Sequence, residues 1–312
     1  MLGLIHPGLT FAFCIPRGHL RTTNFFLTLF LLAIMAPSLA LALDLAWRDA
    51  APFSAGTTVL GLKSTFETAD QLHLNNRAAI TQGTSLYTSI ETLEINQYES
   101  LLGQPCLLGV WVPRYQAGGK LFDTSLTGAS GLADPYLEVA FWPVHRLDWG
   151  TDLALANFVS LPIGAYQPQR RLNAGGNRWT DDFIIGALQT ITSTGLKLEI
   201  TADATIYGPN SNANATHQEL TETPTYRAQI WLSQNLSSQV ILALGYNELW
   251  GGQTKINGTG NGLRSDERQI RLGAEYHFSE RTILEFSAYR DIYRNGGYPW
   301  DQVYQMMIFY NF

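Results

Sequence analysis

Apolar and polar residues alternate one by one through long segments of this chain, and this period of two constrains the fold more than any other feature. In the segment 195–207 the apolar face consists of Leu196, Leu198, Ile200, Ala202, Ala204 and Ile206. The opposite face consists of Lys197, Glu199, Thr201, Asp203 and Thr205. A helical period would scatter the charged residues around its axis, whereas a strand sorts them onto one face. These segments are therefore predicted to be β-strands.

About twelve such segments follow one another after residue 55. They lie near 56–66, 85–98, 105–117, 134–143, 150–161, 180–191, 195–207, 224–234, 239–249, 267–278, 282–292 and 302–312. Their lengths are close to the roughly 9–11 residues that a tilted strand needs to cross a bilayer. The first two segments alternate weakly, and the last seven alternate clearly.

The connections between these segments alternate in length. Short polar turns such as LSSQ (236–239) and SERT (279–282) are separated by long stretches rich in Gly, Asn and Thr, such as GPNSNANATHQELTETP (208–224). A soluble sandwich, the fallback interpretation, has no reason to place every long loop at one end. We therefore predict an all-β fold, a transmembrane antiparallel up-and-down β-barrel of about 12 strands with short periplasmic turns and long external loops.

Aromatic residues fall at the expected strand ends, as the two interface girdles of such a barrel require. The predicted periplasmic girdle comprises Trp142, Trp149, Phe278 and Phe312. The predicted external girdle comprises Trp179, Tyr207, Tyr226, Trp250 and Trp300. The last segment places Tyr304, Met306, Ile308, Tyr310 and Phe312 on one apolar face. We expect that face to meet lipid and the last strand to pair with the first, because a barrel has no free edge.

The N-terminal region carries an apolar run, 25–43, preceded by Arg17 and Arg21 and followed by Ala40-Leu41-Ala42. This pattern predicts a cleaved secretory signal over residues 1–42, and an uncleaved membrane anchor is the alternative. Residues 43–55 are then predicted to be a periplasmic N-terminal segment and residues 56–312 the barrel. The expected location is the outer membrane of a Gram-negative bacterium, reached by Sec-type export.

Charge and composition exclude several classes of function. Removing residues 1–42 takes away two arginines and no acid, so the formal net charge changes from −6 to −8. A nucleic-acid partner would require a basic surface and is not expected. One cysteine, Cys106, remains, and it offers no metal-ligand spacing. The histidines fall in separate segments without a nucleophile motif, so we expect no catalytic residue, no metal and no cofactor.

Polar residues on the inward faces are the candidate functional residues. The predicted pore lining comprises Lys197, Glu199, Asp203, Arg227, Gln229, Arg271, Glu275, His277, Glu285 and Arg290. Ionisable groups within the membrane are costly unless they face water or pair with one another. Two interpretations follow: a water-filled pore whose charges set its selectivity, or a salt-bridge network that plugs a narrow barrel. The sequence leaves both open.

Two segments, GLADPYLEVAFWPV (131–144) and FVSLPIGAYQPQRRLNAGGNRWT (158–180), contain short motifs of Gly, Asp, Asn and Trp. These motifs resemble those of the outer-membrane family named for the meta pathway of phenol degradation. The matching positions are Gly131, Asp134, Asn173, Gly175, Asn177 and Trp179. Ala133 departs from the family pattern, which has a second glycine there. The final residues, with Tyr310 and Phe312, also resemble the assembly signal of bacterial outer-membrane barrels.

The resemblance implies a channel or uptake protein for small hydrophobic or aromatic molecules. The expected partners are outer-membrane lipid, the barrel-assembly machinery and such solutes. One alternative is a structural or adhesive barrel with a plugged lumen and partner-binding external loops. A further alternative is a lipid-modifying enzyme embedded in the barrel.

Overall fold

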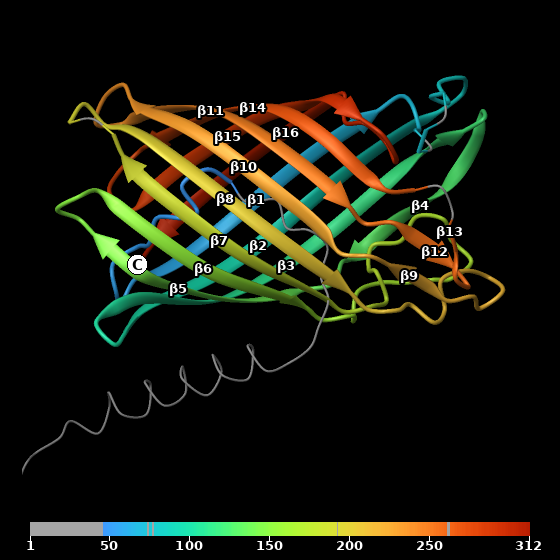
Figure 1. The fold of residues 1–312 in the computed structure, drawn as a ribbon, viewed down its shortest axis with the longest axis horizontal. Helices are drawn as coiled ribbons and strands as arrows, with labels where there is room; N and C mark the ends of the chain where they lie inside the picture. The colour runs from blue at the N-terminus through green and yellow to red at the C-terminus, as the bar shows by residue number, and fades with distance from the viewer. Residues whose placement is uncertain (1–45, 74, 77, 192, 261–262) are drawn as a thin grey trace, which may run out of the picture.

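The computed structural model describes residues 46–73, 75–76, 78–191, 193–260 and 263–312. Within this part of the chain, twelve tilted antiparallel strands close into a barrel (Figure 1). The barrel strands are β1 (Thr58–Ala69), β2 (Ser85–Leu101), β3 (Gln104–Leu121), β5 (Tyr136–Arg146), β6 (Thr151–Ser160), β7 (Thr180–Thr190), β8 (Leu196–Tyr207), β10 (Thr225–Asn235), β11 (Val240–Gly251), β14 (Ser265–His277), β15 (Thr282–Arg294) and β16 (Gln302–Asn311). The predicted fold class is confirmed.

The barrel closes where the first strand pairs with the last. β1 and β16 run antiparallel in a continuous register from Val59 opposite Asn311 to Thr68 opposite Gln302. The backbone N–H of Phe312 extends this seam by donating to the carbonyl of Thr58 at 2.9 Å. Closure satisfies the backbone groups that an open edge would leave unpaired in hydrocarbon. The predicted pairing of first and last strands is thus confirmed.

Connections at the two ends of the barrel differ in length, as predicted. The turns 147–150, 191–195, 236–239 and 278–281 lie at the same end as the start of β1 and the end of β16 (Figure 1). The opposite end carries the long loops 70–84, 161–179, 208–224 and 252–264. Within these loops the short strands β9 (Leu220–Glu222), β12 (Thr254–Ile256) and β13 (Thr259–Gly260) form a separate small sheet. A further strand, β4 (Thr124–Leu132), pairs with the distal part of β3.

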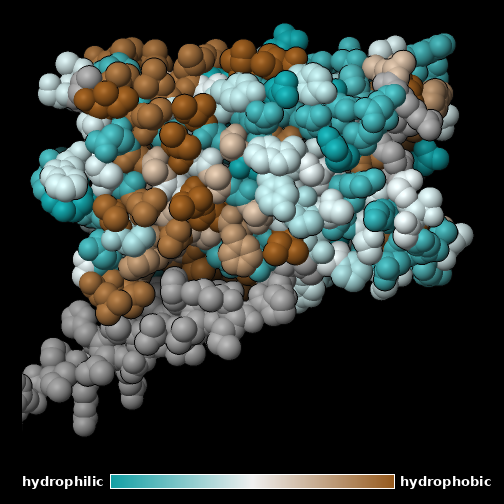
Figure 2. Space-filling view, in the orientation of Figure 1, coloured by the Kyte–Doolittle hydropathy of each residue, from teal (hydrophilic) through white to brown (hydrophobic). Residues whose placement is uncertain are grey.

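The outer face of the barrel is apolar over a broad band. Figure 2 shows hydrophobic side chains gathered over the part of the barrel nearer the short turns, and hydrophilic side chains over the loop end. On β16 the exposed side chains are Tyr304, Met306, Ile308 and Tyr310, while Val303, Gln305 and Met307 are buried on the inward face. An exposed apolar surface of this extent is typical of contact with lipid.

Two of the predicted girdle residues do not belong to a girdle. Trp142 is 1% exposed and points into the barrel interior, and Tyr207 shares the inward face of β8 with Glu199 and Asp203. Their residue type suited an interface, but their position within the strand directs them inward. By contrast, Tyr226 and Trp250 are exposed outside and stack with ring centroids 6.0 Å apart.

Among the described residues, no helix is long and apolar enough to cross a membrane. The predicted signal segment, 1–42, lies outside the described residues.

Candidate functional site in the barrel lumen

Nine of the ten residues predicted to line the lumen have side chains that face it. Their side chains occupy the inward positions of four strands: Lys197, Glu199 and Asp203 on β8, Arg227 and Gln229 on β10, Arg271, Glu275 and His277 on β14, and Glu285 on β15. Most of these side chains are buried, which shows how closely the interior is filled. Arg227 and Asp203, on neighbouring strands, pair at 3.8 Å.

Arg290 is the exception, because it lies on the outer face of β15. It is exposed and sits opposite Ile270, which is 46% exposed on the outer face of β14. Arg290 lies five positions after Glu285, and an odd step along a strand places two residues on opposite faces. The prediction for Arg290 was wrong for this reason. Beyond it, an irregularity between Arg268 and Gln269 shifts the pairing with β15 by one residue.

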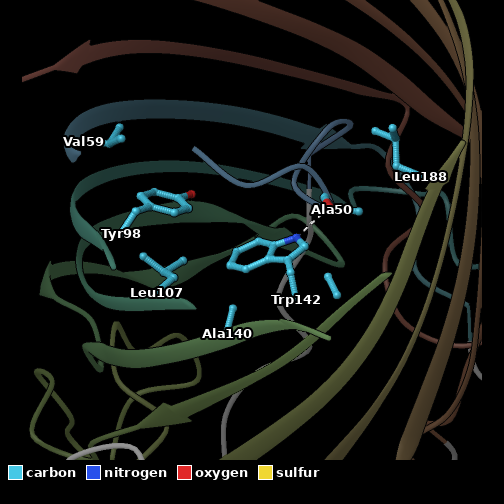
Figure 3. Close-up of a cluster of buried hydrophobic side chains, with 8 residues drawn as sticks. Ala50, Val59, Tyr98, Leu107, Ala140, Trp142 and Leu188 are labelled. Carbon is cyan, nitrogen blue, oxygen red and sulfur yellow. Dashed lines mark hydrogen bonds between the residues drawn. The ribbon is translucent and has the colours of Figure 1, made fainter. Parts of the chain in front are cut away.

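The described residues that directly precede β1 lie inside the barrel. The described part of the segment predicted to be periplasmic, residues 46–55, lies in the lumen beside the turn 278–281, and Figure 3 shows Ala50 of this segment inside the barrel wall. There Ala50 packs in an apolar cluster with Trp142, Tyr98 and Leu188. The indole N–H of Trp142 donates to the carbonyl of Ala50 at 2.8 Å. We refer to residues 46–55 as the lumenal segment.

Two acids of the barrel wall hold the lumenal segment by charge and by hydrogen bonds. The carboxylate of Glu199 accepts from the backbone N–H groups of Arg48 at 2.6 Å and Ala50 at 3.3 Å. The guanidinium of Arg48 forms an ion pair with Glu275, which also contacts the ring of His277. Bonds in which one partner is charged contribute more than neutral ones. Glu199 and Glu275, predicted to line a pore, therefore anchor the segment that crosses it.

A small residue in the wall makes room for the largest side chain of the lumenal segment. Trp47 is 1% exposed and packs against Trp231, Ile241 and Ala243. A Cβ at Gly273 would lie 2.5 Å from the indole nitrogen of Trp47, closer than atoms approach in proteins. The fit of Trp47 thus depends on a glycine in β14, as expected for a closely packed interior.

A cavity of about 90 Å³ remains beside the lumenal segment. Its wall includes the aromatic side chains of Phe53, Tyr98, Trp111, Trp142, Phe158 and Phe309. Trp111 and Phe158 meet edge to face with centroids 5.2 Å apart. The polar groups of the cavity include the ion pair of Lys63 with Glu94 at 2.9 Å. The free space is large enough for several water molecules.

The sequence did not reveal this half of the lumen. Lys63, Glu94, Trp111 and Glu138 lie on β1, β2, β3 and β5, and the first two of these strands alternate only weakly in sequence. One face of β1 is nevertheless visible in the sequence as a period of two, with Gly61, Lys63 and Thr65 at alternate positions. This pattern could have identified β1.

The family-motif residues meet at the base of the external loop 161–179. The carboxylate of Asp134, just before β5, accepts from the backbone N–H groups of Gly164 at 2.7 Å and Gly176 at 2.6 Å. A Cβ at Gly175 would lie 2.8 Å from this carboxylate, so the close approach requires glycine there. Burial raises the pKa of Asp134, while the two N–H donors oppose that shift. Asp134 thus fastens both ends of the loop to the barrel wall.

The remaining motif residues organise the same loop. Asn173 accepts from the backbone N–H of Gln167 at 2.8 Å. Asn177 donates to the side chain of Asn210 at 2.8 Å, which links this loop to the neighbouring loop 208–224. Gly131 lies near the end of β4, and Trp179 directly precedes β7. The structure therefore brings these residues together around a loop, apart from the lumenal segment.

Replacing Asp134 with Asn is expected to loosen the loop 161–179. One carboxylate oxygen becomes an NH2 group facing a backbone N–H, and the charge that strengthens the other bond is lost. We expect trypsin to cleave after Arg170 or Arg171 about tenfold faster or more, since opening the loop becomes easier by roughly 1.5–3 kcal/mol. The matched control is Asp148→Asn, in an exposed turn at the other end of the barrel. Equal cleavage of both variants and the parent would contradict this role.

Comparisons with known proteins agree with this architecture. A family model described as "Putative MetA-pathway of phenol degradation" matches residues 51–301. The crystal structure of an outer-membrane channel from Pseudomonas putida F1 superposes with a TM-score of 0.81 at 19% identity, covering 86% of this chain and 100% of that one. The transport unit of the autotransporter AIDA-I from Escherichia coli gives a TM-score of 0.51 at 12% identity, covering 93% and 98%. The comparison with curated proteins found no match.

Proposed function

We propose that this chain, which belongs to the outer-membrane barrel family named for phenol degradation, admits small hydrophobic or aromatic molecules through its barrel. The observation that carries the proposal is the aromatic cavity in the lumen, enclosed between the barrel wall and the lumenal segment. A path for sugars or ions would be lined by water-exposed polar groups. The cavity in this lumen instead presents aromatic rings, and most of the polar side chains of the lumen are buried.

The lumenal segment makes the barrel a gated path in this proposal. Ala50, Arg48 and Trp47 occupy the interior at the end with the short turns, and they are held by contacts that can break without unfolding the barrel. A twelve-stranded barrel is wider than the eight-stranded barrels that side chains alone fill, so it has room for a segment of chain. Movement of that segment would open a passage.

The experiment is entry of a hydrophobic aromatic dye into Gram-negative cells that export the chain. N-phenyl-1-naphthylamine is neutral, is held back by the outer membrane and fluoresces once inside it. We expect its fluorescence to rise several-fold faster in cells carrying the folded barrel than in cells carrying the empty vector. Entry of a disaccharide should change little. Equal dye entry in both cell lines would refute the proposed uptake.

The alternative function is a structural or adhesive barrel whose lumen stays closed. The anchored lumenal segment is compatible with it, and unchanged dye entry would favour it. In that case the external loops, joined through Asn177 and Asn210, would be the functional surface.

We propose no catalytic role for the barrel. The described histidines lie far apart in the chain and contact different partners: His73 contacts Gln71, His145 contacts Asp152, His217 contacts Asn212, and His277 contacts Glu275. None of these contacts activates a serine or cysteine, as nucleophilic hydrolysis would require. The proposed route to the outer membrane is Sec-type export followed by the barrel-assembly machinery, with Tyr310 and Phe312 as the recognised residues.

A further inference from the structure

We propose that the cavity beside the lumenal segment binds the ammonium group of a small amine with an apolar body, so that the barrel favours cationic over neutral or anionic aromatic solutes. This inference rests on the proposed function, since it names the class of small molecule that the path accepts. It is carried by the charges, the buried polar groups and the rings that line the cavity.

The charged groups of the cavity do not balance. Its described lining contains three carboxylates, on Asp49, Glu94 and Glu138, and two cations, Lys63 and Arg48. The guanidinium of Arg48 is engaged by Glu275, which does not line this cavity, and the ammonium of Lys63 is engaged by Glu94. Asp49 accepts from the backbone N–H of Ala46 at 2.8 Å. One carboxylate, on Glu138, is thus left without a cation of its own.

Glu138 is buried, at 7% exposure, and has no ion-pair partner among the described residues. One of its oxygens accepts from the indole N–H of Trp111 at 2.9 Å, a donor that the side chain of Asn96 shares at 3.3 Å. A neutral N–H compensates a buried carboxylate only in part. A positive group entering the cavity would supply the missing charge.

A second buried group is also unsatisfied. The hydroxyl of Thr201, on β8, lines the same cavity, is 4% exposed and has no hydrogen-bond partner in the described part of the chain. Buried hydroxyls without a partner are rare in proteins and often mark the place of a bound group. An ammonium donates up to three hydrogen bonds, and Thr201 offers an acceptor for one of them.

The rings of the cavity suit the rest of such a molecule. Trp111 already holds one ammonium, that of Lys63, at 4.2 Å from its ring centroid, so this wall is able to take a cation on its face. Phe158, Tyr98 and Trp142 provide apolar surface for an aromatic or alkyl body. A solute with a cationic head and an apolar body therefore matches the cavity better than a neutral molecule of equal size.

The test compares three probes of similar size by titration calorimetry of the purified full chain in detergent near neutral pH. The probes are 2-phenylethylamine, 2-phenylethanol and 3-phenylpropionate. We expect the amine to bind about tenfold tighter or more than the alcohol, and the acid to bind weakest, because a hydrogen-bonded charge pair is stronger than a neutral bond.

The variant Glu138→Gln keeps the size of the side chain and an oxygen that can accept from Trp111. We expect it to bring the amine down to the affinity of the alcohol while leaving the alcohol unchanged. Glu91→Gln, on the exposed outer face of β2, is the matched control and should alter neither. Equal binding of amine and alcohol by the unchanged protein would overturn the inference, whether or not the variant folds.

The same experiment separates this inference from the proposed function. If the alcohol binds and the dye enters cells but the amine has no advantage, only the inference fails. If no probe binds and the dye is excluded, the proposed function fails as well.

Discussion

Replacing residues 46–55 with a Gly/Ser sequence of equal length is expected to raise the ion conductance of the barrel several-fold in a planar bilayer. The replacement removes Trp47 from its seat against Gly273, and removes the guanidinium that pairs with Glu275. It also removes the side chains of Ala50 and Phe53, which pack in the apolar cluster of Trp142. Water should then fill the vacated part of the lumen, because its walls are polar on β8 and β14.

A matched control is the same Gly/Ser replacement over residues 254–260, which form β12 and β13 in an external loop. This control should leave the conductance close to that of the parent. The gel mobility of heated and unheated samples would show that both variants contain a folded barrel. A folded variant of 46–55 with parental conductance would mean that other side chains close the lumen.

Replacing Phe312 with Ser is expected to reduce the amount of folded barrel in the outer membrane strongly, to a small fraction of the parental amount. Phe312 is 67% exposed, and its ring meets that of Tyr310 edge to face at 4.8 Å. The two rings lie at the seam between β1 and β16, beside the bond from the N–H of Phe312 to Thr58. An aromatic pair at this place anchors the seam at the membrane interface, where serine has no comparable affinity.

The Phe312→Tyr variant should retain most of the folded barrel, since tyrosine also suits the interface. Synthesis of the chain should be equal in all three proteins, which isolates the effect to assembly. The measurement is the heat-modifiable band in outer-membrane fractions. A Ser variant that assembles as well as the Tyr variant would show that the ring is dispensable.

The strands of this barrel could be predicted from the sequence because lipid and lumen impose opposite demands on neighbouring residues. Leu272 faces outward at 57% exposure, while Arg271 beside it is 3% exposed. Such a contrast repeats along every clear strand, so both the period and the inward faces of β8, β10 and β14 are visible in the sequence. Arg290 obeys the same alternation, which directs it outward, and the regularity of β15 fails only beyond it, where the pairing with β14 shifts between Asp291 and Tyr293.

The position of the lumenal segment could not be predicted in the same way. Residues 46–55 have no period, so their sequence does not tell whether they lie in the periplasm or in the barrel. Their place depends on partners such as Glu199, which is about 150 positions away along the chain. Trp47 and Phe53 could have indicated that the segment is buried, since two aromatic residues are unexpected in an exposed linker.

The lumenal segment is joined to β1 by only a few residues, because β1 begins at Thr58. A displaced segment would therefore stay near its seat at a local concentration in the millimolar range or above, as for other short tethers. Rebinding is then unimolecular, so the fraction of closed barrels does not depend on how many copies the membrane holds. Closing would therefore need no diffusing partner. A solute that enters the lumen would always compete with the tethered lumenal segment for the same space.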